Sequence, residues 1–166
     1  MIDWILGGIA LALGGGGETD VAGAGMTDPA GESAGGAPTG FAAEPQVPTG
    51  QFTTAVEVKP ILQATKANWV AVREYEGRDL LYVTHLLSWR CGMHQVRYAI
   101  NDGPMQVWPL PPCLEGTAQP NAIRAEDGLP YQVFGLGSVG SVTVEILFDD
   151  LTTDSARFDR AQVLMP

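Results

Sequence analysis

Charged side chains are scarce in this chain, and basic ones are the scarcest. Only 17% of its 166 residues are charged, and 9 Lys and Arg stand against 19 Asp and Glu, which gives a net charge of −10. The basic residues are scattered and form no run. A protein this acidic gains no electrostatic attraction to phosphate backbones or anionic lipid headgroups. We therefore expect neither a nucleic acid nor a membrane surface as its partner.

Sequence motifs for catalysis and cofactor binding are also lacking after residue 50. The serines of that part, Ser88, Ser138, Ser141 and Ser155, do not stand in the G-x-S-x-G pattern of a nucleophile elbow. Residues 135–140 (GLGSVG) fit the letters of the dinucleotide-binding pattern, but that pattern requires a helix directly after the glycines. Here the period-two segment SVTVEILF follows, which is typical of a strand. We therefore interpret the glycines as a bend between two strands, and we expect no cofactor.

Histidine and cysteine, the side chains that most often bind zinc, number only two each. A structural zinc site needs four ligands, so it would consume His85, Cys91, His94 and Cys113 together. A hydrogen-bonded histidine at the core or at an edge is the favoured interpretation of His85, which has apolar neighbours on both sides. The acidic segment 149–154 (DDLTTD) lacks the glycine and the distal glutamate of a calcium loop, which favours a solvated turn over a Ca²⁺ site.

The two cysteines themselves favour a disulfide. Cys91 and Cys113 are 22 residues apart, and each lies near the end of an expected strand or in the loop after one. Two cysteines in an exported protein usually form one bridge. Closing a loop of about 20 residues would remove on the order of 3 kcal/mol of unfolded-state entropy. A free thiol pair and a metal or redox site are the alternatives.

The amino-terminal residues are typical of an export signal. Residues 4–13 (WILGGIALAL) form an apolar run that is too short to span a bilayer, and Ala22-Gly23-Ala24 follows as a small-x-small cleavage pattern. Asp3 stands where a signal peptide usually has positive charge, which leaves an uncleaved tether or a misplaced start as alternatives. We predict an export signal over residues 1–24, a periplasmic or secreted protein, and no integral membrane span after processing.

A Gly-, Ala- and Pro-rich segment separates this signal from the rest of the chain. Residues 1–55 hold 13 of the 21 glycines and six acids but no Lys or Arg. Such a segment cannot bury enough apolar surface to offset the entropy of ordering. We predict a disordered acidic linker over residues 25–50 and one folded domain over residues 51–166, with the boundary near Gln51.

The domain has the alternation and turn signals of short strands. A short helix is expected from Pro60 to Asn68. Strands are expected at 52–58, 69–75, 80–89, 95–101, 105–108, 131–136, 141–148 and 155–165, with turns at 76–79, 101–103 and 149–154 and a rigid proline-rich connection over 109–120. This pattern predicts a mainly β fold, namely an antiparallel β-sandwich that is immunoglobulin-like in the broad sense. The cysteines are too close in sequence for an antibody-type domain.

Aromatic side chains are the last candidates for a binding site. The seven largest in the domain are Trp69, Tyr75, Tyr82, Trp89, Tyr98, Trp108 and Tyr131. Packing in the core is the favoured interpretation, and an exposed platform for a glycan or peptide is the alternative. If a binding surface lies near the cysteines, the sequence predicts that Trp89, Arg90, His94 and Trp108 form it.

Taken together, these patterns favour a non-enzymatic interaction or structural module, exported from the cytoplasm, with a protein or a glycan as its partner. One alternative is a small hydrolase-like enzyme of the cell envelope that uses His85 or His94 with a nearby carboxylate. Another is a binding domain that depends on Ca²⁺ or Zn²⁺.

Overall fold

A computed structural model describes residues 40–166. The predicted export signal (1–24) and most of the predicted linker lie outside the described residues. The described part contains seven strands, three α-helices and three 3₁₀ turns. The strands are β1 (Ala71–Tyr75), β2 (Arg78–Tyr82), β3 (Met93–Ile100), β4 (Gln106–Trp108), β5 (Tyr131–Gly135), β6 (Ser141–Phe148) and β7 (Thr153–Asp159). The helices are α1 (Ala55–Ala64), α2 (Thr84–Leu87) and α3 (Arg160–Val163), and the 3₁₀ turns are Lys66–Asn68, Arg90–Gly92 and Ala125–Asp127.

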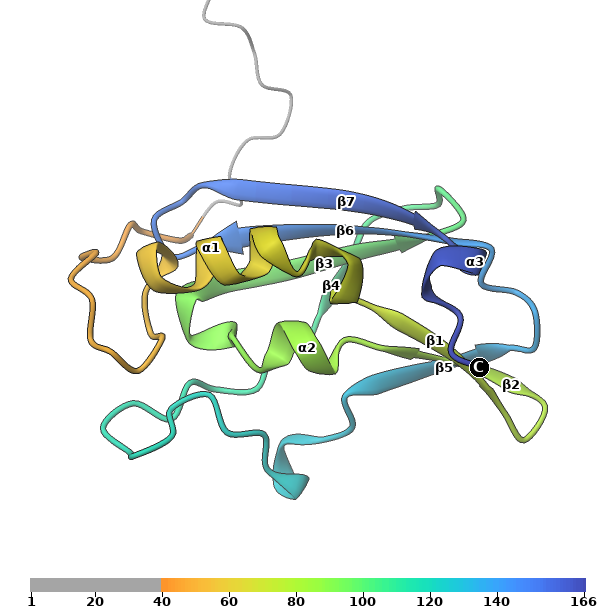
Figure 1. The fold of residues 1–166 in the computed structure, drawn as a ribbon, viewed down its shortest axis with the longest axis horizontal. Coiled ribbons are helices and arrows are strands. Elements are labelled where there is room, and N and C mark those ends of the chain that lie inside the picture. The colour runs from red at the N-terminus through yellow and green to blue at the C-terminus, as the bar shows by residue number, and fades with distance from the viewer. Residues whose placement is uncertain (1–39) are drawn as a thin grey trace, which may run out of the picture. The chain divides into compact units, whose positions relative to one another are not determined.

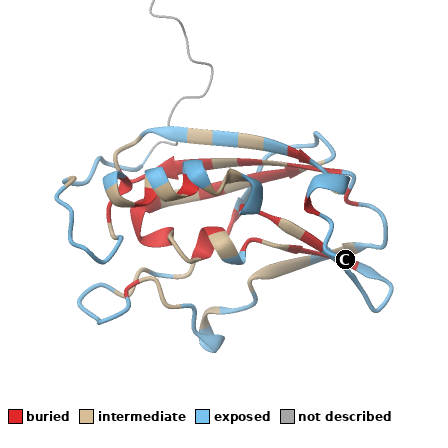
Figure 2. Cartoon of the chain, in the orientation of Figure 1, coloured by how far each residue is buried: buried red, intermediate tan, exposed pale blue. Residues whose placement is uncertain are grey.

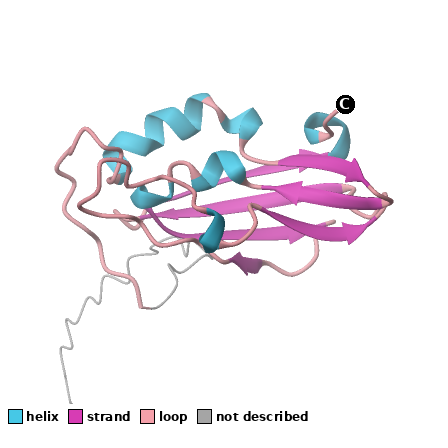
Figure 3. Cartoon of the chain, turned by 90° about the horizontal axis from the view of Figure 1, so that it is seen from below, coloured by secondary structure: helices cyan, strands magenta, loops and turns pink. Residues whose placement is uncertain are grey.

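The strands form two antiparallel sheets, which confirms a mainly β fold with few short helices. A three-stranded sheet has the order β1-β2-β5, and a four-stranded sheet has the order β4-β3-β6-β7. Helices α1 and α2 lie toward one end of β3 and β6, and the β1–β2 hairpin lies toward the other (Figures 1 and 3). The three-stranded sheet is the one that positions the candidate site.

The central strand β6 spans the whole predicted segment 141–148. Its side chains at positions 142, 144, 146 and 148 are buried in the core. On the neighbouring strand β3, Val96 lies opposite Ile146 and Tyr98 lies opposite Val144, and both are also core residues. Buried residues therefore run along the facing sides of β3, β6, α1 and α2 (Figure 2). Period-two alternation identified this strand correctly because one face of it is packed.

Helix α1 replaces the strand that the sequence predicted at 52–58. The spacing of Ala55, Val58 and Leu62 places these side chains on one helical face, and all three are fully buried. Two distant side chains anchor the start of the helix: Asp149 Oδ1 accepts the N–H of Ala55 at 2.8 Å, and Gln46 Oε1 accepts the N–H of Val56 at 2.9 Å. The β-branched residues predicted a strand, but these long-range caps favour the helix.

Two other predicted strands are shorter than expected. The segment 80–89 leaves its strand after Tyr82 and continues as α2, so His85 lies on a helix. The segment 155–165 belongs to β7 only as far as Asp159 and then forms α3. In both places a buried apolar residue of the helix packs into the core, Leu86 in α2 and Val163 in α3. Tertiary packing therefore overrides the local strand preference.

The predicted hairpins are confirmed. Glu76 and Gly77 have φ angles of 48° and 73° and close a two-residue turn between β1 and β2. Asn101 and Asp102, with φ angles of 52° and 58°, turn the chain after β3. Positive φ at both central residues matches the right-handed twist of paired strands, and Asn, Asp and Gly tolerate it best.

Residues just before the predicted domain boundary already contact the domain. The backbone N–H of Glu44 donates to the carbonyl of Asp149 at 2.8 Å. Glu57 accepts hydrogen bonds from the N–H groups of Thr49 and Gly50 at 3.0 and 2.9 Å. Domain contacts therefore begin several residues ahead of Gln51.

Candidate functional site

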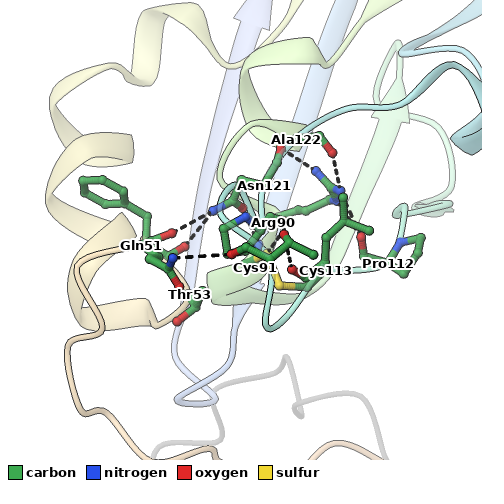
Figure 4. The surroundings of a disulfide bond; sticks show 12 residues. Gln51, Thr53, Arg90, Cys91, Pro112, Cys113, Asn121 and Ala122 are labelled. Carbon is green, nitrogen blue, oxygen red and sulfur yellow. Dashed lines mark hydrogen bonds between the residues drawn. A yellow bond between two sulfur atoms is a disulfide. The ribbon is translucent and has the colours of Figure 1, made fainter.

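The predicted disulfide is present between Cys91 and Cys113, whose Cα atoms are 5.0 Å apart. The bridge ties the 3₁₀ turn Arg90–Gly92, directly before β3, to the proline-rich connection (Figure 4). A bridged sulfur has no thiolate to offer a metal. The zinc site of two cysteines and two histidines considered from the sequence is therefore wrong.

Arg90, beside this bridge, is a buried structural residue with only 2% exposure. Its guanidinium donates hydrogen bonds to backbone carbonyls alone (Figure 4). The acceptors are Leu87, Pro111, Pro112, Asn121 and Ala122. Burial lowers the pKa of Arg90. Because the carbonyls come from the connection, from the two residues that follow it and from α2, Arg90 holds this loop against the domain.

The other residues predicted near the cysteines do not share one surface. Trp108 is 3% exposed and packs against Tyr98 in the core. His94 is half-buried, and its Nε2 is hydrogen-bonded to the carbonyl of Ala42 at 2.8 Å. Trp89 is half-buried and packs edge-on against Phe52 beside a pocket of about 300 Å³. Trp89 therefore remains the accessible aromatic near the disulfide.

His85 lines another, mostly apolar pocket of about 340 Å³, whose wall also includes Arg73 and Tyr82. The hydroxyl of Thr65 donates its only proton to the carbonyl of Ile61 at 2.7 Å, so in its 2.8 Å contact with His85 it must accept from Nε2–H. Burial lowers the pKa of His85, which keeps the ring neutral at neutral pH. Within residues 40–166, no carboxylate is hydrogen-bonded to this ring.

The three-stranded sheet presents a second candidate on its outer face. Val72 of β1 and Leu81 of β2 are fully buried and lie opposite each other, which fixes the inner face of this sheet. Successive side chains of a strand point to opposite faces. The outer face therefore carries Ala71, Arg73 and Tyr75 from β1, Arg78, Leu80 and Tyr82 from β2, and Tyr131, Val133 and Gly135 from β5. We call the set Arg73, Tyr75, Arg78, Tyr82 and Tyr131 the tyrosine–arginine face.

Contacts within this face confirm the arrangement. The rings of Tyr82 and Tyr131 are 4.9 Å apart, and the Arg73 guanidinium lies 4.8 Å from the centre of the Tyr75 ring. Tyr75 is 48% exposed. A hollow of about 320 Å³ in the middle of the face is lined by Tyr75, Arg78 and Tyr131. Tyr75 and Arg78 therefore lie at the hairpin end of the face, Tyr82 and Tyr131 lie at its other end, and Arg73 lies between them on β1.

The arginines of this face differ from all the other basic residues. Arg73 and Arg78 make no ion pair or side-chain hydrogen bond with any residue from 40 to 166, although Glu76 lines the same hollow as Arg78. The other seven basic side chains are engaged: Arg90 with carbonyls, and Lys59, Lys66, Arg97, Arg124, Arg157 and Arg160 with carboxylates. In a protein of net charge −10, the uncompensated positive charge of the described part is thus gathered on one sheet face.

Comparison of the chain with protein-family models, curated proteins and solved structures gave no match. The functional interpretation therefore rests on the geometry.

The inner side of the same sheet is fixed by a buried ion pair. Asp79 is fully buried and receives the Arg160 guanidinium at 2.6 and 3.0 Å. The N–H groups of Gly137 and Val139 also donate to its carboxylate. These contacts, led by that of Arg160, lower the pKa of Asp79 from 3.8 to about 2. The pair joins β2, α3 and the turn before β6, so it holds the sheet that carries the candidate face.

The described residues form neither a candidate metal site nor a membrane-spanning helix. Among the described residues, no group of three His, Cys, Asp or Glu side chains is placed to hold a metal ion. In the acidic turn, Asp150 pairs with Lys59 and Asp154 pairs with Lys66. Over the same part of the chain, no helix has the length and apolar character required to cross a bilayer.

Sequence reasoning named the tyrosines of this face but missed its arginines. The signal was present in the segment 71–75, where Arg73 and Tyr75 alternate with Val72. Combined with the predicted turn at Glu76-Gly77, this alternation places Arg78 beside Tyr75 on the same face. What the sequence could not show is that the other basic residues have partners.

Proposed function

We propose that the protein is an exported, non-enzymatic interaction module that binds an acidic protein or glycan through the tyrosine–arginine face. The observation that carries this proposal is the coincidence, on one sheet face, of the two arginines without a described partner and three tyrosines.

The chemistry of these side chains suits recognition of carboxylates. Tyr and Arg are enriched among the residues that dominate binding energy at interfaces. The planar guanidinium matches a carboxylate with two parallel hydrogen bonds, and tyrosine gives a large contact area at low entropic cost. An arginine whose charge is uncompensated in the free protein loses no internal partner on binding. A carboxylate-rich partner is therefore attracted to this face, while the rest of the acidic surface repels it.

We infer the compartment and the finer fold from the same features. A disulfide persists in oxidising compartments, so the Cys91–Cys113 bridge supports a periplasmic or secreted protein. The immunoglobulin-like sandwich is supported by a shared core, since Val72 and Leu81 of one sheet belong to the same buried cluster as Val144 of the other.

The test uses the full chain immobilised under oxidising conditions, with poly-glutamate and polymannuronate as the acidic protein-like and glycan probes. We expect binding of at least one probe that weakens with salt. The variant R73Q/R78Q should weaken it by about tenfold or more. The control R97Q/R157Q removes the same net charge from the four-stranded sheet, where both arginines are ion-paired. Equal loss in both variants, or no binding to either probe, would overturn the proposal.

A second candidate function follows from the His85 pocket. A neutral histidine with its Nε2–H held by Thr65 leaves Nδ1 with a lone pair, which is the form required of a general base. This lone pair supports a hydrolase-like function, whereas the carboxylate partner expected from the sequence is not hydrogen-bonded to the ring among residues 40–166. Turnover of p-nitrophenyl acetate that exceeds that of free imidazole and is lost in H85Q would support it. Turnover unchanged in H85Q would leave the interaction module as the function.

A further inference from the structure

The edges of the two sheets differ in how they are protected. The outer edge of β1 is covered by the carboxyl-terminal residues, because Met165 N–H donates to the Val72 carbonyl at 2.7 Å. Strand β4 has only three residues, and β7 carries Asp154, Arg157 and Asp159. Short strands and charged side chains discourage pairing with another chain. Strand β5 is the remaining edge, and no strand from the described part of the chain pairs with its free side.

Strand β5 lacks these protective features. Its sequence YQVFG contains no charged residue. Val133 within it is 47% exposed, and Leu129 and Leu136, which flank it, are 67% and 57% exposed. An exposed and uncharged edge strand with apolar side chains is a template for strand addition.

The direction of the backbone groups of β5 follows from its register with β2. The N–H of Val83 donates to the carbonyl of Pro130 at 3.0 Å, which makes this a hydrogen-bonded pair. Hydrogen-bonded and non-hydrogen-bonded pairs alternate along an antiparallel ladder. Counting along the register, Gln132 and Phe134 point their backbone groups at β2.

Tyr131, Val133 and Gly135 therefore point their N–H and C=O groups away from β2. The Gly135 carbonyl accepts a bond from the N–H of Ser138 at 3.0 Å. The backbone N–H and C=O groups of Tyr131 and Val133 have no hydrogen-bond partner among residues 40–166. Two residues at alternate positions thus offer both a donor and an acceptor, which is the pattern that an added strand requires.

Side chains beside this edge define what the added strand would carry. Arg78 lies opposite Gly135, which has no side chain to cover it. Gly77, Arg78, Val133, Phe134 and Gly135 line a hollow of about 360 Å³ at this place. A strand added to β5 would place alternate side chains on the outer face, next to Val133 and within the reach of the Arg78 guanidinium. An acidic side chain there would meet a guanidinium that makes no ion pair with any residue from 40 to 166.

We propose that the partner of the tyrosine–arginine face is a protein, and that it binds by adding an extended, acidic segment as a fourth strand beside β5. This inference rests on the proposed function and selects a peptide over a glycan. Backbone hydrogen bonds to Tyr131 and Val133 hold the segment, and a carboxylate at an outward-facing position pairs with Arg78.

The test measures the affinity of the full chain for an end-blocked peptide of alternating glutamate and valine residues, by isothermal titration calorimetry. The variant V133P removes an outward N–H without removing a bond to β2, so the sheet should persist, and V133T keeps this N–H as a control. We expect V133P to weaken binding by about tenfold or more and V133T to leave it nearly unchanged.

A change in the peptide tests the same point without altering the protein. Alternate N–H groups of an extended peptide point to its opposite edges. Methylating the backbone nitrogens at every second residue therefore removes the hydrogen-bond donors of one edge while the carboxylates remain. Of the two peptides methylated in this way, the one that loses the donors facing β5 should not bind. A lysine–valine peptide should bind weakly, because it repels Arg78.

The outcomes separate this inference from the proposed function. If R73Q/R78Q weakens binding but V133P and the methylated peptides do not, the face binds acidic ligands without strand addition, and the inference is overturned while the proposed function stands. Failure of every variant to change binding, or absence of binding, overturns both. A dimer of the chain that V133P dissociates would assign the edge to a second copy and also overturn the inference.

Discussion

At the scale of single residues, the arginines of this protein show how one side chain takes three roles. Arg90 donates only to carbonyls and holds a loop. Arg160 pairs with the buried carboxylate of Asp79 and holds a sheet. Arg73 and Arg78 have no such partner in the described part and are available to a ligand. The environment, rather than the residue type, determines the role.

Replacing Arg90 should destabilise the proline-rich connection. In R90A the carbonyls of Leu87, Asn121 and Ala122 and those of the two prolines lose their donor, so we expect the free energy of unfolding to fall by about 3 kcal/mol. Urea unfolding under oxidising conditions measures the change. The control is R124A, which removes an exposed guanidinium that pairs with Glu126 and Asp127 and should lower the free energy of unfolding much less. Equal losses in the two variants would contradict the role of Arg90.

Asp79 should make stability depend on acid pH. Its pKa falls from 3.8 to about 2 on folding, chiefly because Arg160 donates to it. Because its pKa is lower in the folded than in the unfolded chain, the ionised carboxylate stabilises the fold by about 2 kcal/mol at pH values above the unfolded-state pKa. This contribution is lost as the pH falls from about 5 to 2. The melting temperature of D79N should therefore vary less over this range than that of the wild type. Some dependence should remain from Glu57, whose pKa also falls to about 2.

At the scale of elements, sequence patterns predicted the strands better than the helices. Strand β6 was identified because one of its faces is packed, which leaves a period-two signal. The helix predicted from Pro60 to Asn68 corresponds to the second half of α1 and the 3₁₀ turn after it. The first half of α1 was missed because its start is anchored by Asp149 and Gln46, which lie outside the helix and, for Asp149, nearly a hundred residues away. A short helix with β-branched residues forms when tertiary contacts supply its caps, and these contacts leave no local signal.

The candidate site, too, could be predicted from the sequence only in part, because contacts between remote residues leave no local signal. The alternation in β1 and the turn at Glu76-Gly77 sufficed to place Tyr75 and Arg78 together. The isolation of the arginines could not be predicted, because the partners of the other basic residues are remote in sequence. Arg160 and Asp79 are 81 positions apart, for example. Charge compensation is a property of the folded surface, and only the structure shows where it is incomplete.

Strand β5 should show alternating protection of its backbone amides. The N–H groups of Gln132 and Phe134 point at β2, whereas those of Tyr131 and Val133 point away from it. We expect slow hydrogen exchange for the first pair and fast exchange for the second in the full chain, measured residue by residue by NMR. Slow exchange at Val133 in the monomer would show that its edge is already covered.

At the scale of the whole molecule, export and the disulfide belong to one prediction. The bridge supports an oxidising compartment, and the amino-terminal sequence predicts delivery there. Intact mass of the protein recovered from the cell envelope should show a chain processed near Ala24 and lighter than its reduced form by two hydrogen atoms. Recovery of the whole chain with free thiols would contradict both export and the bridge.

The central claim is that an acidic molecule attracts acidic partners through one face, because its uncompensated arginines lie there. An NMR titration of the full chain with the glutamate–valine peptide tests it most directly, since amide shifts locate the contact surface. We expect the largest shifts in β1, β2 and β5, around Tyr75, Arg78 and Val133, with little change in β6 and β7. Shifts confined to the Trp89 and Phe52 pocket, or none at saturating peptide, would contradict the claim.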